Sequence, residues 1–192
     1  PVRVDADDPA LWIHPTDATR LGVQMGDLLR VSTRTGYYVN AAWVTEGVRP
    51  GVVACSHHMG RWTVSGDQVS GNHWQLHDVD LRKVTPTAWL MRRTKPTGAF
   101  ASKDKDSAKV WWSSGGVHQN MTFPVQPDPV SGMHCWHQKV VVTKAEAGDR
   151  YGDVFVDTAK SMAVFEEWLA KARPAGQFGT DGLRRPLHLK RV

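Results

Sequence analysis

Short apolar runs broken by glycine turns are the feature that most restricts the fold of this sequence. Residues 28–33 form an apolar run, Gly36 marks a tight turn after it, and 37–44 return with mixed polarity. This pattern predicts a β-hairpin, because strands of this length are joined at glycine turns. A second turn over 45–51 leads to residues 52–55, which we expect to form a buried strand.

Two helices are expected beside these strands. Pro15 suits the first turn of a short helix after a strand at 10–14, and Gly22 suits the position past its end. The one long helical pattern runs from Asp157, with Asp157 or Thr158 as its cap. Its apolar face, predicted to be core or a docking surface, comprises Met162, Phe165, Trp168, Leu169 and Ala172.

Residues 63–109 differ from the segments on either side, because glycines and prolines interrupt them and 103–106 form a solvated charge run. We interpret 63–109 as an insertion packed on the outside of a barrel, with one strand at 88–92. The sequence therefore predicts a single mainly β domain over 1–192. Its parts would be a barrel core (about 10–62 and 110–157), the inserted 63–109 segment, and a C-terminal helix plus extended tail (157–192).

The net charge of +5, from 24 basic and 19 acidic residues, permits an anionic partner such as nucleic acid, acidic lipid or a phosphate-bearing cofactor. A basic surface without a specific partner is the alternative. There is no long run of consecutive basic residues, which disfavours a nucleic-acid arm. No apolar stretch is long enough to span a membrane, and two cysteines are too few for a disulfide scaffold or an iron–sulfur cluster.

The segment 120–139 carries most of the candidate chemistry. Asp128 stands between two prolines, and histidine, cysteine, tryptophan and glutamine crowd into 134–138. An all-valine run, 140–142, follows and is expected to be a buried strand. Polar and aromatic side chains that lead straight into a strand are typical of a loop that lines a site on a rigid sheet.

The same residue types also occur in metal sites and as nucleophiles. His73 and His77 have the spacing of zinc ligands on a helix, and Cys135 and His137 could share a metal with Cys55 or His57. Cys135 could also form a catalytic pair with a distant histidine. Bulky neighbours favour a desolvated, inert thiol there instead. The chain offers no complete catalytic set, so we predict no catalytic and no metal-binding residues.

Two blocks of sequence carry a resemblance to a known family. The first is 14–53, with its Val-Thr-Glu-Gly-Val-Arg-Pro-Gly-Val-Val motif at 44–53; the second has Asn120, an Asp-Pro-Val-Ser turn at 128–131, and Trp136 beside His137 and Gln138. In these residues the chain resembles the C-terminal dinucleotide-binding domain of the dimethyl sulfoxide reductase family. Those molybdenum or tungsten oxidoreductases carry a bis(molybdopterin guanine dinucleotide) cofactor. The resemblance covers 10–62 and 110–143.

The resemblance implies a double-psi β-barrel and a set of cofactor contacts. Asn120 would hydrogen-bond the pterin or guanine edge with its amide, and Gly60 would allow close approach of the backbone. His137 stands where the family often has Lys, so its charge depends on its surroundings. The implied cofactor-binding residues are His57, His58, Gly60, Trp62, Asn120, Trp136, His137 and Gln138.

The resemblance also implies a larger protein. The metal and its ligand, and an iron–sulfur cluster, would lie elsewhere in a catalytic subunit of which this non-catalytic domain is the C-terminal part. Expected partners are the remaining domains and an iron–sulfur electron-transfer subunit, with no nucleic acid and no direct membrane insertion. The alternatives are a small cofactor-binding subunit of a formylmethanofuran dehydrogenase-like complex, or a stand-alone metal- or nucleic-acid-binding β-barrel. Substrate, choice of Mo or W, and compartment are not predicted.

Overall fold

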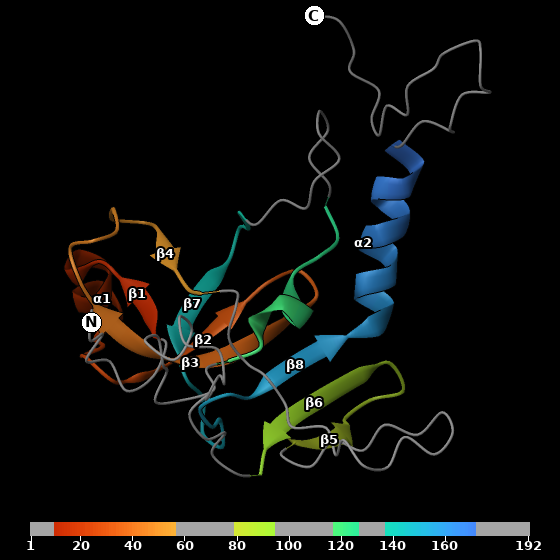
Figure 1. The fold of residues 1–192 in the computed structure, drawn as a ribbon, viewed down its shortest axis with the longest axis horizontal. Helices are drawn as coiled ribbons and strands as arrows, with labels where there is room; N and C mark the ends of the chain where they lie inside the picture. The colour runs from red at the N-terminus through yellow and green to blue at the C-terminus, as the bar shows by residue number, and fades with distance from the viewer. Residues whose placement is uncertain (1–9, 57–78, 95–116, 127–136, 172–192) are drawn as a thin grey trace, which may run out of the picture.

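The computed structural model describes residues 10–56, 79–94, 117–126 and 137–171. Within these ranges the chain is mainly β, with one mixed sheet and two α-helices (Figure 1). The elements are β1 Leu11–Ile13, α1 Pro15–Leu21, β2 Leu28–Ser32, β3 Gly36–Val44, β4 Val53–Ala54, β5 Val79–Lys83, β6 Ala88–Arg93, the 3-10 helix η2 Gln119–Thr122, β7 Val141–Lys144, β8 Val154–Asp157 and α2 Thr158–Lys171.

Strand β3 is the centre of the sheet. The strand order is β4-β1-β3-β8-β6-β5, and β2 lies on the other edge of β3, where it also pairs with β7. The predicted hairpin is therefore present, with Leu28 opposite Ala41 and Ser32 opposite Tyr37. The mainly β prediction is confirmed. The described strands do not close into a barrel, so the double-psi barrel stays a prediction.

Helix α1 follows the local signals in its sequence. Pro15 occupies its first turn, where a missing N–H costs nothing. The Nδ1 atom of His14 accepts a hydrogen bond from the Thr16 N–H at 3.2 Å, and Gly22 ends the helix in the left-handed region with φ 64°. Local capping thus fixes this helix at the bounds that the sequence predicts.

Part of the segment 63–109 belongs to the main sheet. Strand β6 pairs antiparallel with β8, with Leu90 opposite Phe155, and β5 continues the sheet beyond β6. Val79 and Met91 are buried members of the hydrophobic core. Residues 79–93 therefore extend the main sheet beyond β8, and the interpretation of 63–109 as an insertion packed on the outside of a barrel stays a prediction, because the described strands form no closed barrel.

The predictions of burial fail at the edges of the fold. Val141 is 64% exposed and Val52 is 44% exposed, although both runs are predicted to be buried strands. Among the described strands, β7 pairs only with β2 and β4 only with β1, so each is an edge strand of the described sheet. Alternate side chains of an edge strand can face water, which accounts for the exposure of Val141. Val52 lies in the turn before β4, where its N–H bonds to the Arg49 backbone oxygen.

Helix α2 is confirmed, but two members of its predicted apolar face, Met162 and Phe165, are exposed, so the core alternative fails for them and the docking-surface alternative stays a prediction. Met162 is 55% exposed and Phe165 is 42% exposed, whereas Val164 is buried at 4%. The helix leaves the end of β8 and runs away from the sheet (Figure 1), touching β6 and β8. No helix in the described ranges is long and apolar enough to cross a membrane.

Candidate functional site

The site begins at η2, because this helix carries Asn120. The backbone oxygen of Thr122, at the end of η2, accepts hydrogen bonds from the hydroxyls of both Thr33 and Thr35, the latter at 2.7 Å. The Thr122 hydroxyl in turn donates to the Gln119 backbone oxygen at 2.7 Å. Thr35 and Thr122 are fully buried. The β2–β3 turn therefore holds η2 in one position on the sheet, and Asn120 lies partly buried within it.

A second contact joins η2 to the segment after β4. The side-chain amide of Gln119 donates to the backbone oxygen of Ser56, the residue directly before His57. Gln119 is 1% exposed whereas Ser56 is exposed, so this bond is partly buried. Ser56, just before the predicted cofactor loop at 57–62, and Gln119, just before the predicted cofactor contact Asn120, are therefore neighbours in space, although they are far apart in sequence.

The start of β7 lies beside the same turn. Val141 pairs with Ser32, the residue before Thr33. His137 and Gln138 precede this strand, His137 exposed and Gln138 partly buried. Three separate segments, the ends of β4 and η2 and the start of β7, thus adjoin the β2–β3 hairpin. This is the region where the sequence places its candidate residues.

The other predicted site residues, His57, His58, Gly60, Trp62 and Trp136, lie outside the described residues, as do His73, His77 and Cys135. The structure therefore brings Gln119, which is next to Asn120, together with Ser56, the residue before the predicted loop, and the predicted cofactor contacts stay a prediction. In the described ranges no group of three or more His, Cys, Asp or Glu side chains could hold a metal.

The buried thiol beside this region is a poor nucleophile. Cys55 is a free cysteine, and its Sγ accepts a hydrogen bond from Asn40 Nδ2 at 3.3 Å. Burial raises the pKa of the Cys55 thiol to about 11, against the lowering effect of that hydrogen bond. Burial also raises the pKa of the neighbouring Tyr38 well above its ordinary value. Both groups are neutral near pH 7, so this wall of the site offers hydrogen bonds rather than nucleophiles.

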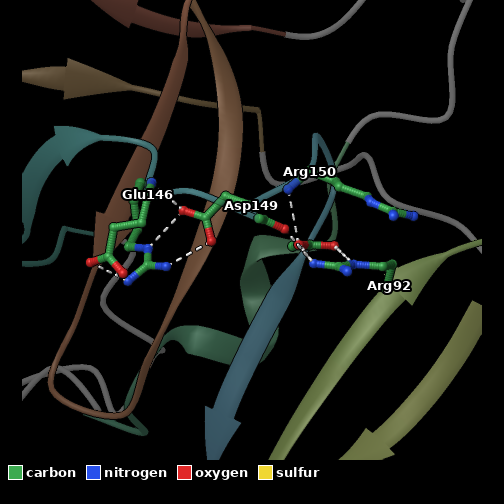
Figure 2. Close-up of polar contacts among 7 residues, drawn as sticks. Arg92, Glu146, Asp149 and Arg150 are labelled. Carbon is green, nitrogen blue, oxygen red and sulfur yellow. Dashed lines mark hydrogen bonds and ion pairs between the residues drawn. The ribbon is translucent and has the colours of Figure 1, made fainter.

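A charged network fixes the turn between β7 and β8 (Figure 2). Arg30 donates from Nε and Nη2 to the two oxygens of Asp149, at 3.0 Å and 2.7 Å, and also pairs with Glu146. Arg92 pairs in the same two-pronged way with the buried Asp153. The guanidinium of Arg30 stacks 4.0 Å from the centre of the Tyr37 ring. These pairs tie β2 and β6 to one turn, and we assign them a structural role.

Gln119 is the residue of this region that the sequence analysis missed. It lies between His118 and Asn120. Neither the spacing nor the composition of the sequence distinguishes the side-chain amide of Gln119 from that of Asn120. Its importance depends on the contact with Ser56, which is a property of the folded chain. The adjacent Asn120 is identifiable because it belongs to a motif.

The comparisons with known proteins agree with the sequence resemblance. The family model described as "Molydopterin dinucleotide binding domain" matches residues 2–140. A putative catalytic subunit of dimethyl sulfoxide reductase from Halobacterium salinarum is 36% identical over 80 residues, which is 42% of this chain and 9% of that protein. ArrA, the molybdopterin-containing subunit of the arsenate respiratory reductase of Chrysiogenes arsenatis, is 38% identical over 64 residues, 33% of this chain and 7% of that protein. No solved structure matches the chain significantly.

Proposed function

Because this chain belongs to the molybdopterin dinucleotide-binding domain family, we propose that it fixes a bis(molybdopterin guanine dinucleotide) cofactor while the metal is held by other domains. The observation that carries the proposal is the bond between Gln119 and Ser56, which joins the two segments that the family resemblance assigns to the cofactor. The double-psi barrel and the contacts of His57, His58, Gly60, Trp62, Trp136, His137 and Gln138 belong to this proposal.

The chemistry of the described residues fits such a ligand. The region offers side-chain amides, backbone carbonyls and a neutral thiol, with no carboxylate–histidine cluster in the described ranges. A pterin or guanine ring presents N–H donors and carbonyl acceptors on one edge, which amides match in both senses. The buried amide oxygen of Gln119 has no partner in the described part of the chain, so the region still has hydrogen-bonding capacity for a ligand.

Each segment has a distinct task in this proposal. The Thr33 and Thr35 hydroxyls hold η2, so the Asn120 amide is positioned before the ligand arrives. The contact with Ser56 fixes where the 57–62 loop begins. When bound, the cofactor and its metal supply the redox chemistry, and these residues bind and orient the organic part.

The activity of the whole protein is also a proposal, since the curated relatives are matched over less than a tenth of their length. We propose that the chain is part of a molybdenum or tungsten oxidoreductase. The metal ligand and an iron–sulfur cluster would lie outside it. Its partners would be the other domains of the catalytic subunit, together with an iron–sulfur electron-transfer subunit. The two named oxidoreductase subunits among its relatives support this assignment.

The test is cofactor occupancy in the full-length protein that contains this chain. Asn120→Ala should lower the pterin content per polypeptide severalfold and leave the melting temperature of the cofactor-free form nearly unchanged, because Asn120 is only partly buried. Met121→Ala is the matched control, since Met121 lies next to Asn120 in η2 and is 40% exposed. Normal occupancy in the Asn120 variant would remove this residue from the site.

A further inference from the structure

The side-chain oxygen of Gln119, in η2, is buried and lacks a hydrogen-bond partner among the described residues. In the part of the chain that the structure describes, Gln119 Oε1 has neither a donor nor contact with solvent, and the residue is 1% exposed. An unsatisfied buried acceptor costs about 1–3 kcal/mol. Such a group in a native fold calls for an explanation, and a donor supplied by a bound component of the functional protein is one.

The orientation of this oxygen is set by the rest of its side chain. The amide nitrogen of Gln119 donates to the backbone oxygen of Ser56, which fixes the amide plane and turns Oε1 away from Ser56. The Thr122 hydroxyl holds the Gln119 backbone oxygen from the other side. The amide therefore cannot rotate to satisfy its oxygen without breaking the contact that joins η2 to the segment after β4.

The missing donor has a recognisable chemistry. Pterin and guanine share a 2-amino-4-oxopyrimidine edge. Its ring N–H and its amino group are hydrogen-bond donors, and a fixed amide oxygen can accept hydrogen bonds from them. We propose that Gln119 Oε1 accepts a hydrogen bond from this edge of the bound cofactor and is a specificity-determining contact. The inference rests on the proposed function, and it adds Gln119 to the residues proposed to contact the cofactor.

The experiment compares Gln119→Leu and Gln119→Glu with the unmodified full-length protein. Gln119→Leu removes the acceptor at similar volume, so cofactor retention on dilution should fall about tenfold, the order expected for one buried hydrogen bond. The cofactor-free form should keep its melting temperature within a few degrees, because removal of an unsatisfied acceptor offsets the loss of the bond to the exposed Ser56. Gln119→Glu keeps an oxygen at the same place and should retain more cofactor than Gln119→Leu. Met121→Leu, on the exposed side of η2, should behave as the unmodified protein.

Two results would overturn the inference. Normal retention in Gln119→Leu would mean that an internal water or nothing satisfies the oxygen. A loss of retention that accompanies an equal loss of stability in the cofactor-free Gln119→Leu protein would mean that the residue acts only by holding Ser56. If Gln119→Glu does not fold, the comparison of retention with stability in Gln119→Leu still decides the matter. Absence of pterin from the unmodified protein would instead contradict the proposed function.

A second experiment tests whether Gln119 Oε1 contacts the guanine ring or the pterin ring. GMP carries the guanine edge without the pterin, and its binding to the cofactor-free protein can be followed by thermal shift. If guanine is the partner, GMP should raise the melting temperature of the unmodified protein and not that of Gln119→Leu. An equal response in both proteins assigns the contact to the pterin ring.

Discussion

The side chains described in the candidate region offer hydrogen bonds rather than charges, because its ionisable groups Cys55 and Tyr38 are neutral near pH 7. Cys55 shows this most clearly, since it is a reactive residue type beside the proposed ligand wall. Burial raises the pKa of the thiol, so very little thiolate is present at neutral pH. In the sequence, a cysteine close to two histidines suggests a catalytic or metal-binding role. The packing around Cys55 in the folded chain argues against a catalytic role.

The pKa of Cys55 predicts slow alkylation. A thiol whose pKa rises from 9.0 to about 11 has its thiolate fraction at pH 8 reduced about a hundredfold. Peptide mass spectrometry after a timed pulse of iodoacetamide should therefore show Cys55 modified at least that much more slowly in the folded than in the urea-unfolded protein. Equal rates in the two states would show that the thiol is accessible and ionises normally.

Asp149 predicts how stability depends on pH. Burial raises the pKa of this carboxyl, but hydrogen bonds from Arg30 and from the Glu146 N–H outweigh it, and the net pKa lies below 3.8. A carboxyl with a lowered folded-state pKa contributes stability that is present above its unfolded pKa and is lost as pH falls through the folded pKa. Asp149→Asn should therefore lower the free energy of unfolding at pH 7 and flatten its decline below about pH 4.

The measurement is urea denaturation at a series of pH values, with Asp80→Asn as the control. Asp80 is an exposed carboxylate in β5, so its substitution should leave the pH profile unchanged. An Asp149→Asn protein whose stability still falls with acid as steeply as that of the unmodified protein would show that the Arg30 pair does not carry this dependence.

Elements whose signals are local are the ones that the sequence predicts well. Pro15, Gly22 and the capping side chain of His14 lie within one short segment, so the bounds of α1 follow from the sequence itself. The hairpin of β2 and β3 is similar, since its turn is marked by Gly36. The exposure of Val141 and the orientation of α2 depend on which neighbours each element has, and periodicity alone does not contain that information.

Gly36 is required for a close contact rather than for an unusual backbone angle. A Cβ at this position would lie 1.9 Å from the backbone oxygen of Phe155, where β3 meets β8. Gly36→Ala should therefore push the two strands apart and lower the free energy of unfolding by at least about 2 kcal/mol. Thermal or urea denaturation measures the loss.

Gly51 provides the matched control for that substitution. It has φ +79°, and a Cβ added there would meet no atom within 4 Å, so Gly51→Ala introduces backbone strain without a clash. The expected cost is about 1 kcal/mol. If Gly51→Ala were as damaging as Gly36→Ala, strand proximity would not be the reason for the glycine at 36.

At the scale of the whole molecule, the sequence predicts the family and the general region of the site but not how its parts are joined. Asn120 can be named because it belongs to a motif, and the family model matches residues 2–140. The contact of Gln119 with Ser56 and the addition of β6 to β8 link segments far apart in sequence. Such pairings follow from the three-dimensional packing of the sheet and have no counterpart in local composition.

The central claim is that η2 and the segment after β4 form one wall for the cofactor. Hydrogen–deuterium exchange of the full-length protein, with and without bound cofactor, tests it most directly. We predict that backbone amides of 117–126 and 53–56 become more protected on loading, while those of the solvent-facing strand β5, Val79–Lys83, do not change. The claim would be contradicted if amides of 117–126 and 53–56 exchanged at the same rate with and without cofactor, in a protein shown to carry the cofactor when loaded.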